Sequence, residues 1–487
     1  MMDAVKESFA ASSFRDPAGR VFRYGDEILR LVNGIGTADW QALLASATGK
    51  ELLDAGTIVP TRVLDDAETA ALLESDAIRT MYQGCHAELV LSHERIAFPS
   101  FPYEWPPEML HAAGRLTLEL AEALLADDLG LKDATPYNIL FRGTEPVFTD
   151  VLSVERRTAG DPIWLPYAQF VRTFLLPLLA NARFGMSLEA IFTTRRDGLE
   201  PEDLYRLTGM VKRLRPPFLG LVSMPTWLGR GKERESIYER RALSNPEKAR
   251  FILRSTLRSL GRKLKRLAPA AGKNSVWSDY MSSNNNYTAE HFHEKQAFVQ
   301  RAMEEFRPRQ VLDVGCNTGH FSAIGARAGA SVVAVDYDPV VVGNVWRAAR
   351  EEKLNILPLV VNLTRPSPAT GWRNRECPSF LDRARGHFDG VLMLAVIHHM
   401  LVTERVPLEQ ILDQAAELIA GAGILVVEYV GPKDSMFHRL ARGRDELHRD
   451  LTVERFEQVC GQRFETVRSQ HVEGTERVLY LLRKRVP

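Results

Sequence analysis

From residue 310 onward, short apolar runs alternate with segments whose apolar residues recur at helical spacing. The apolar runs predict buried strands at 310–314, 331–335, 356–361, 388–394, 423–430, 464–470 and 477–483. The periodic segments predict helices at 319–329, 339–352, 378–385, 405–420 and 452–461. No helix fits between the last two strands, which predicts a hairpin with one antiparallel strand. The pattern as a whole predicts an α/β domain built on a doubly wound, mostly parallel sheet.

The first half of the chain has a different pattern, in which short strands are followed by helices. Its predicted elements are strands at 20–24 and 27–31, helices at 40–53, 107–129 and 167–179, and a strand pair within 131–141 and 146–150. Prolines and aromatic residues fill 98–105, a composition that suits an extended connector between two lobes. We therefore predict an α+β domain over residues 1–229.

Residues 230–276 are predicted to form a basic helical linker. Basic residues outnumber acidic ones 13 to 4 between 230 and 266, and leucines mark one face of a helix whose opposite face carries arginines. The simplest interpretation is a solvated helix that docks one domain on the other. Binding of an anionic glycan, lipid or nucleic acid is the alternative. The second domain is then predicted to span 277–487.

Composition narrows the class of protein. The chain has 487 residues, more than one hydrophobic core organises, and its 62 basic and 62 acidic residues give no net charge that would call for nucleic acid. The four cysteines form no Cys-x-x-Cys pair, which argues against a zinc site or a disulfide framework. The N-terminal residues lack a signal-peptide pattern, and no apolar run reaches about 18 residues. We expect a cytoplasmic protein, with peripheral membrane contact left open and the oligomeric state unspecified.

The stretch from Asp313 to Gly319 is the strongest candidate for a ligand site. It joins a predicted strand to a predicted helix, and Gly315 and Gly319 let the backbone turn sharply and approach a ligand. Its spacing is not the Gly-x-Gly-x-x-Gly of dinucleotide enzymes, and the sequence has no Gly-x-x-x-x-Gly-Lys-Ser/Thr phosphate loop. About 20 residues further on, Asp336 ends the next strand, where doubly wound nucleotide sites bind ribose hydroxyls.

These motifs make the second domain resemble class I S-adenosylmethionine-dependent methyltransferases, whose Rossmann-like sheet has seven strands. The resemblance implies S-adenosyl-L-methionine as the cofactor and makes Asp336 the group that binds its ribose hydroxyls. It also implies that Asn362 contacts adenine, where the amide oxygen would accept from the adenine amino group, although aspartate is common there. The full set of candidate cofactor-binding residues is Asp313, Gly315, Cys316, Asn317, Gly319, Asp336, Tyr337, Asn362, Leu363 and Leu394.

The fourth strand of this family ends beneath the cofactor, close to its methyl group, and here it is followed by His398 and His399. A hydroxyl acceptor must lose its proton during methyl transfer, and a neutral histidine can take that proton. We therefore predict a catalytic role for these two residues, with His398 as the first choice. Two histidines with a purely structural role are the alternative.

Further candidates surround the predicted cofactor site. Glu428 and Asp434 are expected at the mouth of the pocket, because open α/β sheets bind ligands beyond the carboxyl ends of their strands. Upstream of the loop, Tyr280, Tyr287 and Lys295 are in a position to cover the cofactor. The insertion 364–376 is rich in groups that recognise polar ligands, so it is assigned to acceptor binding, with a connecting loop as the equal alternative.

A second set of candidates lies in the first domain. Asp133, Asn138 and Asp150 repeat the catalytic-loop and metal-binding spacing of protein kinases and small-molecule phosphotransferases. By that resemblance Asp133 would be the base, while Asn138 and Asp150 would hold magnesium on ATP. The flanking residues depart from the family pattern, no glycine-rich loop precedes them, and Arg30 stands where a phosphate-binding lysine is expected. The alternative is a domain that recognises the acceptor, and no other metal site is predicted.

The two-part layout resembles bacterial methyltransferases related to rhizobial host-specificity nodulation proteins. The stretches that carry the resemblance are Phe14-Arg-Asp-Pro17, residues 132–138, Arg365-Pro-Ser-Pro368 with Gly371-Trp372, and His398-His399. The resemblance implies a small-molecule acceptor such as a carbohydrate or a lipid-linked glycan. Three hypotheses follow: a methyltransferase of an oxygen or nitrogen acceptor, a bifunctional kinase and methyltransferase, and a non-enzymatic protein that binds S-adenosylmethionine or RNA.

Overall fold

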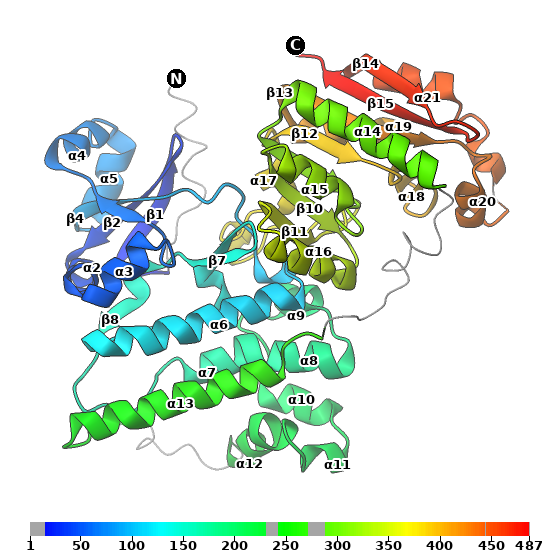
Figure 1. Ribbon diagram of the computed structural model, residues 1–487. Helices are drawn as coiled ribbons and strands as arrows, with labels where there is room; N and C mark the ends of the chain where they lie inside the picture. The colour runs from blue at the N-terminus through cyan, green and yellow to red at the C-terminus, as the bar shows by residue number, and fades with distance from the viewer. Residues whose placement is uncertain (1–14, 230–241, 271–287, 444, 487) are drawn as a thin grey trace.

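The computed structural model describes residues 15–229, 242–270, 288–443 and 445–486, and these form two parts. The first part combines an N-terminal sheet with a bundle of helices, and the second is a single large sheet with helices on both faces (Figure 1). A helix long and apolar enough to cross a membrane is absent from these ranges.

The first part opens with a four-stranded antiparallel sheet in the order β1-β2-β4-β3. Its strands are β1 (Gly19–Tyr24), β2 (Glu27–Asn33), β3 (Thr61–Val63) and β4 (Ala87–His93). The helices inserted between the strands are α2 (Gly34–Ala45), α3 (Ala47–Asp54), α4 (Asp66–Leu72) and α5 (Asp76–Gly84). The single helix predicted over 40–53 is divided, because the Ser46 hydroxyl accepts a hydrogen bond from the Gly49 N–H and caps a new helix.

Helix α6 (Pro107–Leu124) begins the helical bundle. It ends before the predicted 129, because residues 129–131 form strand β5 and pair with β8 (Val154–Arg156). The hairpin of β6 (Ile139–Arg142) and β7 (Glu145–Phe148) lies between them, within the predicted strand pair. The helices that follow are α7 (Tyr167–Phe170), α8 (Leu176–Phe184), α9 (Leu188–Thr194), α10 (Pro201–Leu207), α11 (Met210–Arg213), α12 (Met224–Gly229) and α13 (Pro246–Arg266).

Helix α13 packs against α6, so it is held by the first part (Figure 1). Its leucine face is buried, through Leu253, Leu257, Leu260 and Leu264. On its other side, Arg250 pairs with Asp128 and Arg258 pairs with Glu122. Residues 246–266 of the predicted linker therefore lie on the first domain, while 230–241 and 271–276 are outside the described residues.

The second part is a seven-stranded sheet in the order β11-β10-β9-β12-β13-β15-β14. Its strands are β9 (Gln310–Val314), β10 (Ser331–Asp336), β11 (Ile356–Val360), β12 (Phe388–Met393), β13 (Ile419–Val430), β14 (Phe464–His471) and β15 (Arg477–Lys484). Strand β15 pairs antiparallel with β13 and β14, whereas β9 to β13 are parallel. The predicted doubly wound sheet with its antiparallel hairpin strand is confirmed.

Helices cover both faces of this sheet. They are α14 (Ala289–Phe306), α15 (His320–Arg327), α16 (Pro339–Glu351), α17 (Phe380–Ala384), α18 (Ile397–Val402), α19 (Leu408–Leu418), α20 (Ser435–Ala441) and α21 (Val453–Cys460). Alternate strand residues enter two different cores: Val311 packs in the core that includes α14, and Leu312 packs in the core that includes α19 and α21. Burial on both faces explains why these strands are apolar throughout.

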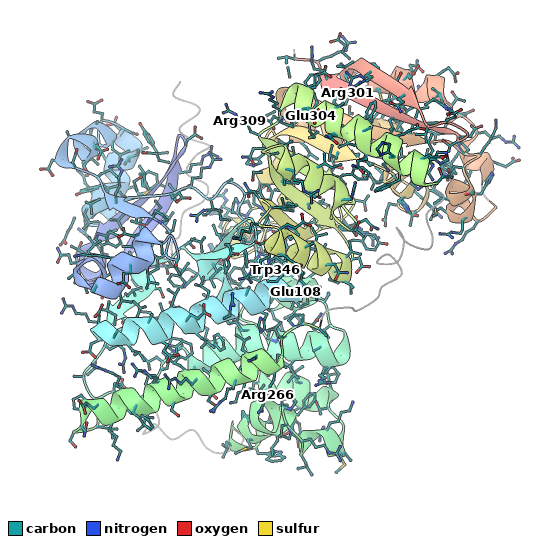
Figure 2. The ribbon with its side chains drawn as sticks, in the orientation of Figure 1. Glu108, Arg266, Arg301, Glu304, Arg309 and Trp346 are labelled. Atoms are coloured by element: carbon teal, nitrogen blue, oxygen red, sulfur yellow. The ribbon has the colours of Figure 1, made fainter. Side chains whose placement is uncertain are left out.

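The two parts meet along a buried interface. Glu104, in the connector before α6, is fully buried and accepts hydrogen bonds from Ser367 and Arg383 of the second part. The ring of Phe98 packs 5.7 Å from the ring of Phe380, measured between centroids. Farther along, Glu108 on α6 lies against α16, where it pairs with Arg347 (Figure 2). The predicted connector 98–105 is thus also a contact surface for the second part.

Candidate functional site

A cavity of about 440 Å³ lies at the carboxyl ends of the parallel strands. Four segments that follow β9, β10, β11 and β12 supply most of its wall. The predicted cofactor-binding residues that line it are Asp313, Gly315, Cys316, Asn317, Asp336, Tyr337, Asn362, Leu363 and Leu394. Gly319 is the predicted residue that does not line it. The sheet therefore brings together side chains that are up to about 80 positions apart in the sequence, because parallel strands end at the same edge.

The loop after β9 has an unusual backbone. Gly315, Asn317 and Gly319 all have positive φ, at 70°, 46° and 77°. A Cβ on Gly319 would lie 2.9 Å from a methyl group of Val345 on α16, so this glycine allows close packing of the helix that the loop precedes. A Cβ on Gly315 would lie 3.1 Å from Val396, across the cavity wall. The two glycines thus hold the loop close to its neighbours and leave its polar backbone toward the cavity.

Asp336 closes β10 and is tied to this loop. Its Oδ2 accepts a hydrogen bond from the Asn317 N–H at 3.1 Å, and its Oδ1 accepts one from the Asp338 N–H at 3.1 Å. Burial raises the pKa of Asp336 to about 6, against which these hydrogen bonds act. Each carboxylate oxygen has a second acceptor position, so the group can still receive hydroxyl donors from the cavity.

Asp313 is buried beneath the loop and accepts a hydrogen bond from the Ser322 hydroxyl at 2.6 Å. Removal from water raises the pKa of Asp313 to about 6. Burial and the nearby Asp336 carboxylate also raise the pKa of the Cys316 thiol well above its ordinary value. The thiol of Cys316 is therefore protonated and serves as an apolar wall of the cavity.

Asn362, after β11, uses its amide oxygen locally. Its Oδ1 accepts from the Thr364 N–H at 3.0 Å and from the Thr364 hydroxyl at 2.6 Å. Both lone pairs of this oxygen are then engaged, so the group it can offer a cavity ligand is the Nδ2 donor. The oxygen that was expected to accept from adenine is thus engaged within the loop by Thr364.

The segment after β12 separates the two predicted catalytic histidines. His399 lines the cavity, whereas His398 is 1% exposed, does not line it, and has no hydrogen-bond partner on either ring nitrogen. Burial lowers the pKa of His399 to about 4 and lowers the pKa of His398 well below its usual range. The first choice, His398, is therefore corrected: α18 turns His398 into the core and His399 toward the cavity. Ala395, two residues before the start of α18, also lines the cavity. Its φ of 52° is an uncommon conformation for a residue with a Cβ.

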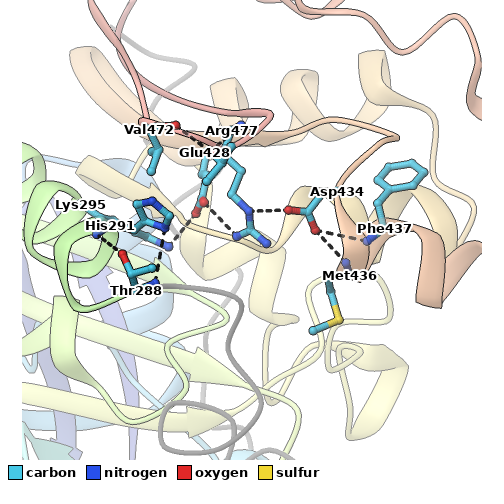
Figure 3. Close-up of polar contacts among 10 residues, drawn as sticks. Thr288, His291, Lys295, Glu428, Asp434, Met436, Phe437, Val472 and Arg477 are labelled. Atoms are coloured by element: carbon cyan, nitrogen blue, oxygen red, sulfur yellow. Dashed lines mark hydrogen bonds and ion pairs between the residues drawn. The ribbon is translucent and has the colours of Figure 1, made fainter.

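A buried network of charges stands behind one wall of the cavity (Figure 3). Lys295 of α14 lines the cavity and places its Nζ 2.6 Å from Oε2 of Glu428. Arg477 of β15 bridges Oε1 of Glu428, at 3.2 Å, and Oδ2 of Asp434, at 2.8 Å. Burial lowers the pKa of Lys295, and the Glu428 carboxylate opposes that shift. The prediction that Glu428 and Asp434 lie at the pocket mouth is wrong, because both serve this internal network.

The insertion after β11 divides between the cavity and the interface. Thr364 and Arg365 line the cavity, and Nη2 of Arg365 lies 2.8 and 3.0 Å from the two carboxylate oxygens of Glu404. The end of the insertion turns to the first part, where Glu376 pairs with Arg15 and Arg196. Only the start of the predicted acceptor-binding segment therefore reaches the cavity. Tyr280 and Tyr287, expected to cover the cofactor, are outside the described residues.

The candidate phosphotransferase residues also meet in space. Asp150 pairs with Arg30 at 2.7 Å, and Arg30 is additionally 3.6 Å from Asp16. Burial raises the pKa of Asp133, and the charge of Asp150 adds to this shift. In the part of the chain that the structure describes, no group of three or more His, Cys, Asp and Glu side chains is arranged to hold a metal ion. One of the two carboxylates in this candidate site, that of Asp150, is therefore already paired with an arginine, Arg30.

Several residues of the cavity and its network were missed from the sequence. Phe292, His320 and Phe321 line the cavity beside Lys295, and their rings pack together, with His320 and Phe292 centroids 4.7 Å apart. Arg477 was missed because it sits on the last strand, far in sequence from the loop. The amphipathic pattern of α14 was the available signal for Phe292, since the helix had to present one face to the sheet, whereas Lys295 was among the predicted residues.

Comparisons with known proteins concern the second part and the chain as a whole. Residues 287–470 match the family model described as a methyltransferase domain. Among solved structures, the chain is similar to N-methyltransferase NodS from Bradyrhizobium japonicum WM9, with a TM-score of 0.30 and 15% identity over 40% of this chain and 97% of that one. It is also similar to the bifunctional kinase-methyltransferase WbdD, with a TM-score of 0.29 and 15% identity over 42% of this chain and 41% of that one.

The second part is accordingly a class I S-adenosylmethionine-dependent methyltransferase, as predicted from its loop and strand ends. The chain as a whole has a relative of the same layout: nodulation protein NoeA of Rhizobium meliloti (strain 1021) is 30% identical over 481 residues, which cover 98% of this chain and 96% of that protein. Because the similarity extends over both parts, the protein belongs to the family of nodulation protein NoeA.

Proposed function

We propose that the protein methylates a hydroxyl or amine of a small-molecule acceptor, of carbohydrate or lipid-linked glycan type, and that its first part presents this acceptor. The observation that carries the proposal is the convergence of Asp336, Asn362 and His399 on one cavity. Its volume, about 440 Å³, lies within the range of about 300–1,000 Å³ that small-molecule sites occupy. S-adenosylmethionine bound there would supply an electrophilic methyl group.

The residues of the cavity fit the parts of this cofactor by their chemistry. The Asp336 carboxylate has free acceptor positions for two ribose hydroxyls. The Asn362 amide offers its Nδ2 donor to a ring nitrogen of adenine. The Lys295 ammonium, which lines the cavity, suits the charged amino-acid end, because an ammonium attracts a carboxylate. We assign these roles on that basis.

His399 is the residue that we propose as the general base. Its pKa of about 4 leaves the imidazole neutral near pH 7, so a ring nitrogen has a lone pair for the acceptor proton. As the acceptor oxygen or nitrogen bonds to the methyl group, its proton would pass to this nitrogen, and later to solvent. A base with so low a pKa is weak, so alignment and exclusion of water must supply much of the acceleration.

The acceptor is proposed to enter beside Arg365, Thr403 and Glu404, which line the cavity on its β12 side. The Arg365 side chain is exposed and held by Glu404, so it can donate to hydroxyl or anionic groups of a substrate. The same insertion continues to Glu376, which pairs with Arg15 and Arg196 of the first part. This continuity supports a first part that helps to position the acceptor.

Phosphate transfer by the first part is the second candidate function. The proximity of Asp133, Asn138 and Asp150 favours it, with magnesium and ATP as the required ligands. The Arg30–Asp150 ion pair opposes it, because an arginine at 2.7 Å competes with magnesium for the carboxylate. Calorimetry with ATP and magnesium tests this second function. Binding that Asp150→Ala abolishes supports phosphate transfer, and the absence of ATP binding rules phosphate transfer out.

Calorimetry with S-adenosylhomocysteine tests the main proposal without an identified acceptor. We expect the intact protein to bind it and Asp336→Ala to bind about 100-fold more weakly, while Asp413→Ala, a partly exposed aspartate on α19, leaves the affinity unchanged. Incubation with methyl-labelled S-adenosylmethionine and separated lipid, glycan and protein fractions then identifies the acceptor class. Label that enters only protein or nucleic acid contradicts the proposed acceptor.

A further inference from the structure

Large apolar side chains are exposed on α10, α11 and α12 and on the residues that join these helices. Seven of the nineteen large hydrophobic residues that are exposed in the described part of the chain lie within 207–228. They are Leu207, Met210, Val211, Leu214, Met224, Trp227 and Leu228, which we call the apolar face. Met210 is 80% exposed and Leu228 is 75% exposed, values at which a side chain contributes nothing to the fold. Isolated exposed apolar residues are ordinary, but such a concentration marks an interaction site.

The apolar face is part of a well-packed unit. Leu204 of α10 is buried, and so are Leu221 and Val222 of the π-helical turn Leu219–Ser223 that leads into α12. Tyr205 ties them together: its hydroxyl accepts from the Trp227 indole N–H at 3.0 Å, and the Arg213 guanidinium lies 3.8 Å from its ring. The outer side chains are therefore presented by a fixed surface, because the inner contacts hold the three helices in place.

The charges within the stretch that carries this face are basic, and Glu202, at the start of α10, is the acidic residue beside its end at Gly229. Residues 204–229 contain Arg206, Lys212, Arg213 and Arg215 and no aspartate or glutamate. Arg206, Lys212 and Arg215 are exposed beside the apolar side chains. In Figure 1 the unit lies at the lower edge of the molecule, on the side opposite the seven-stranded sheet. A partner that meets it must accept inserted apolar groups and also carry negative charge.

We propose that residues 206–229 bind the surface of an anionic lipid bilayer. Leucine, methionine and tryptophan side chains partition into the boundary between headgroups and acyl chains, while basic residues contact the lipid phosphates. A bilayer matches both features of the apolar face, namely its apolar groups and the excess of basic residues among them. The proposal concerns where the protein works, and it stands whether or not the cavity transfers a methyl group.

A second copy of this chain or another protein would be the competing occupant. A protein partner of an apolar patch carries its own apolar patch, and its charges would have to be acidic opposite Arg206, Lys212 and Arg215. Self-association through this face would bring the same basic residues together, which repel one another. The charge pattern therefore favours lipid over a second copy.

Vesicle flotation with the full chain tests the proposal. We expect the protein to float with vesicles of phosphatidylcholine containing about one third phosphatidylglycerol, and to remain largely unbound with phosphatidylcholine alone. Met210→Glu combined with Leu228→Glu should lower the bound-to-free ratio about tenfold or more, because two inserted side chains become charged. Lys212→Glu with Arg215→Glu should lower it as well, and binding by the unaltered chain should fall as salt rises.

The control pair is Ile35→Glu with Leu447→Glu, which alters two equally exposed apolar residues outside 206–229. It should float like the unaltered protein. Failure of the unaltered protein to bind anionic vesicles overturns the proposal, as does equal loss of binding in the control pair. If the unaltered protein is a dimer that does not bind vesicles, and Met210→Glu combined with Leu228→Glu makes it a monomer, the face would be assigned to self-association instead. Circular dichroism spectra that coincide for all variants establish that each is folded.

Discussion

The Nζ of Lys295 lies 2.6 Å from Oε2 of Glu428, and neither side chain is in contact with bulk solvent. The pair joins α14 to β13, and Arg477 extends it to β15 and to the cap of α20. Four elements of the second part are therefore connected by charge next to the cavity wall. A buried carboxylate that serves two cations is stable only while both cations remain, since each charge has lost its hydration.

Glu428→Gln should consequently destabilise the protein strongly. The amide cannot neutralise Lys295 or Arg477, so two buried cations lose a counter-charge, and we expect a decrease of about 3–5 kcal/mol in the free energy of unfolding. Urea unfolding followed by circular dichroism measures it. Glu476→Gln is the matched control, because Glu476 pairs with Lys433 at 3.6 Å on the surface and should change stability by less than about 0.5 kcal/mol.

A double-mutant cycle separates the pair from its surroundings. Lys295→Met should also destabilise, but Lys295→Met combined with Glu428→Gln should cost less than the sum of the two single changes, because the contact between Lys295 and Glu428 can be lost only once. Additive effects would show that Lys295 and Glu428 do not interact.

Asp313→Asn should stabilise the cofactor-free protein at neutral pH. The folded-state pKa of Asp313 is about 6, above the ordinary 3.8, so the folded state binds more protons than the unfolded state between these values. Stability from this group is present below pH 3.8 and is lost as pH rises through 6. The variant has no such loss and still accepts from Ser322, so its advantage should grow from pH 4 to 6 and reach roughly 3 kcal/mol above pH 6.

Thermal unfolding of the two proteins from pH 4 to pH 8 measures this difference. Asp382→Asn, which replaces a surface aspartate at the start of α17, controls for the general effect of one fewer charge. A constant difference across the range, or a variant that is less stable at pH 8, would contradict the raised pKa of Asp313.

The sequence was sufficient to predict the sheet and its loop because both signals are local. Strands buried on both faces are apolar without interruption, and a glycine at positive φ leaves a recognisable spacing, as at Gly315 and Gly319. The location of Asp336 at the cavity followed from the same logic, since its position at a strand end fixes the edge at which it lies. These features depend on a few neighbouring residues.

The errors concern relationships that local pattern does not contain. Lys295 and Glu428 are 133 positions apart, so their pairing, which removes Glu428 from the pocket mouth, depends on how α14 crosses the sheet. His398 and His399 are adjacent, and the start of a short helix decides which of them faces the cavity. The insertion illustrates a third case, because its polar residues recognise the first part of the same chain at Glu104 as well as the cavity.

Asn362→Asp tests which polarity residue 362 offers to the cofactor. Aspartate keeps an oxygen for Thr364 but has no Nδ2 donor, so we expect S-adenosylhomocysteine to bind roughly tenfold more weakly. If the side chain instead accepted from the adenine amino group, aspartate would bind equally well or better. Calorimetry at pH 7.5 distinguishes the two outcomes. Asn374→Asp, in the same insertion but not lining the cavity, should leave the affinity unchanged.

His399→Asn and His398→Phe should separate the two histidines by function. His399→Asn removes the proposed base from the cavity, so the rate of methyl transfer to the acceptor fraction should decrease about 100-fold or more, while the affinity for S-adenosylhomocysteine changes little. His398→Phe replaces a buried ring whose two nitrogens have no hydrogen-bond partner, so it should retain activity and match or exceed the stability of the unaltered protein.

The pH profile adds a test of the low pKa of His399. With a pKa of about 4 in the free protein, the imidazole stays neutral at all higher pH values, so kcat/KM should be level between pH 6 and 8 and fall only as pH approaches 4. A base with an ordinary histidine pKa would instead show a fall in rate below about pH 6.5. Such a fall in the unaltered protein, if it disappeared in His398→Phe, would return the catalytic role to His398.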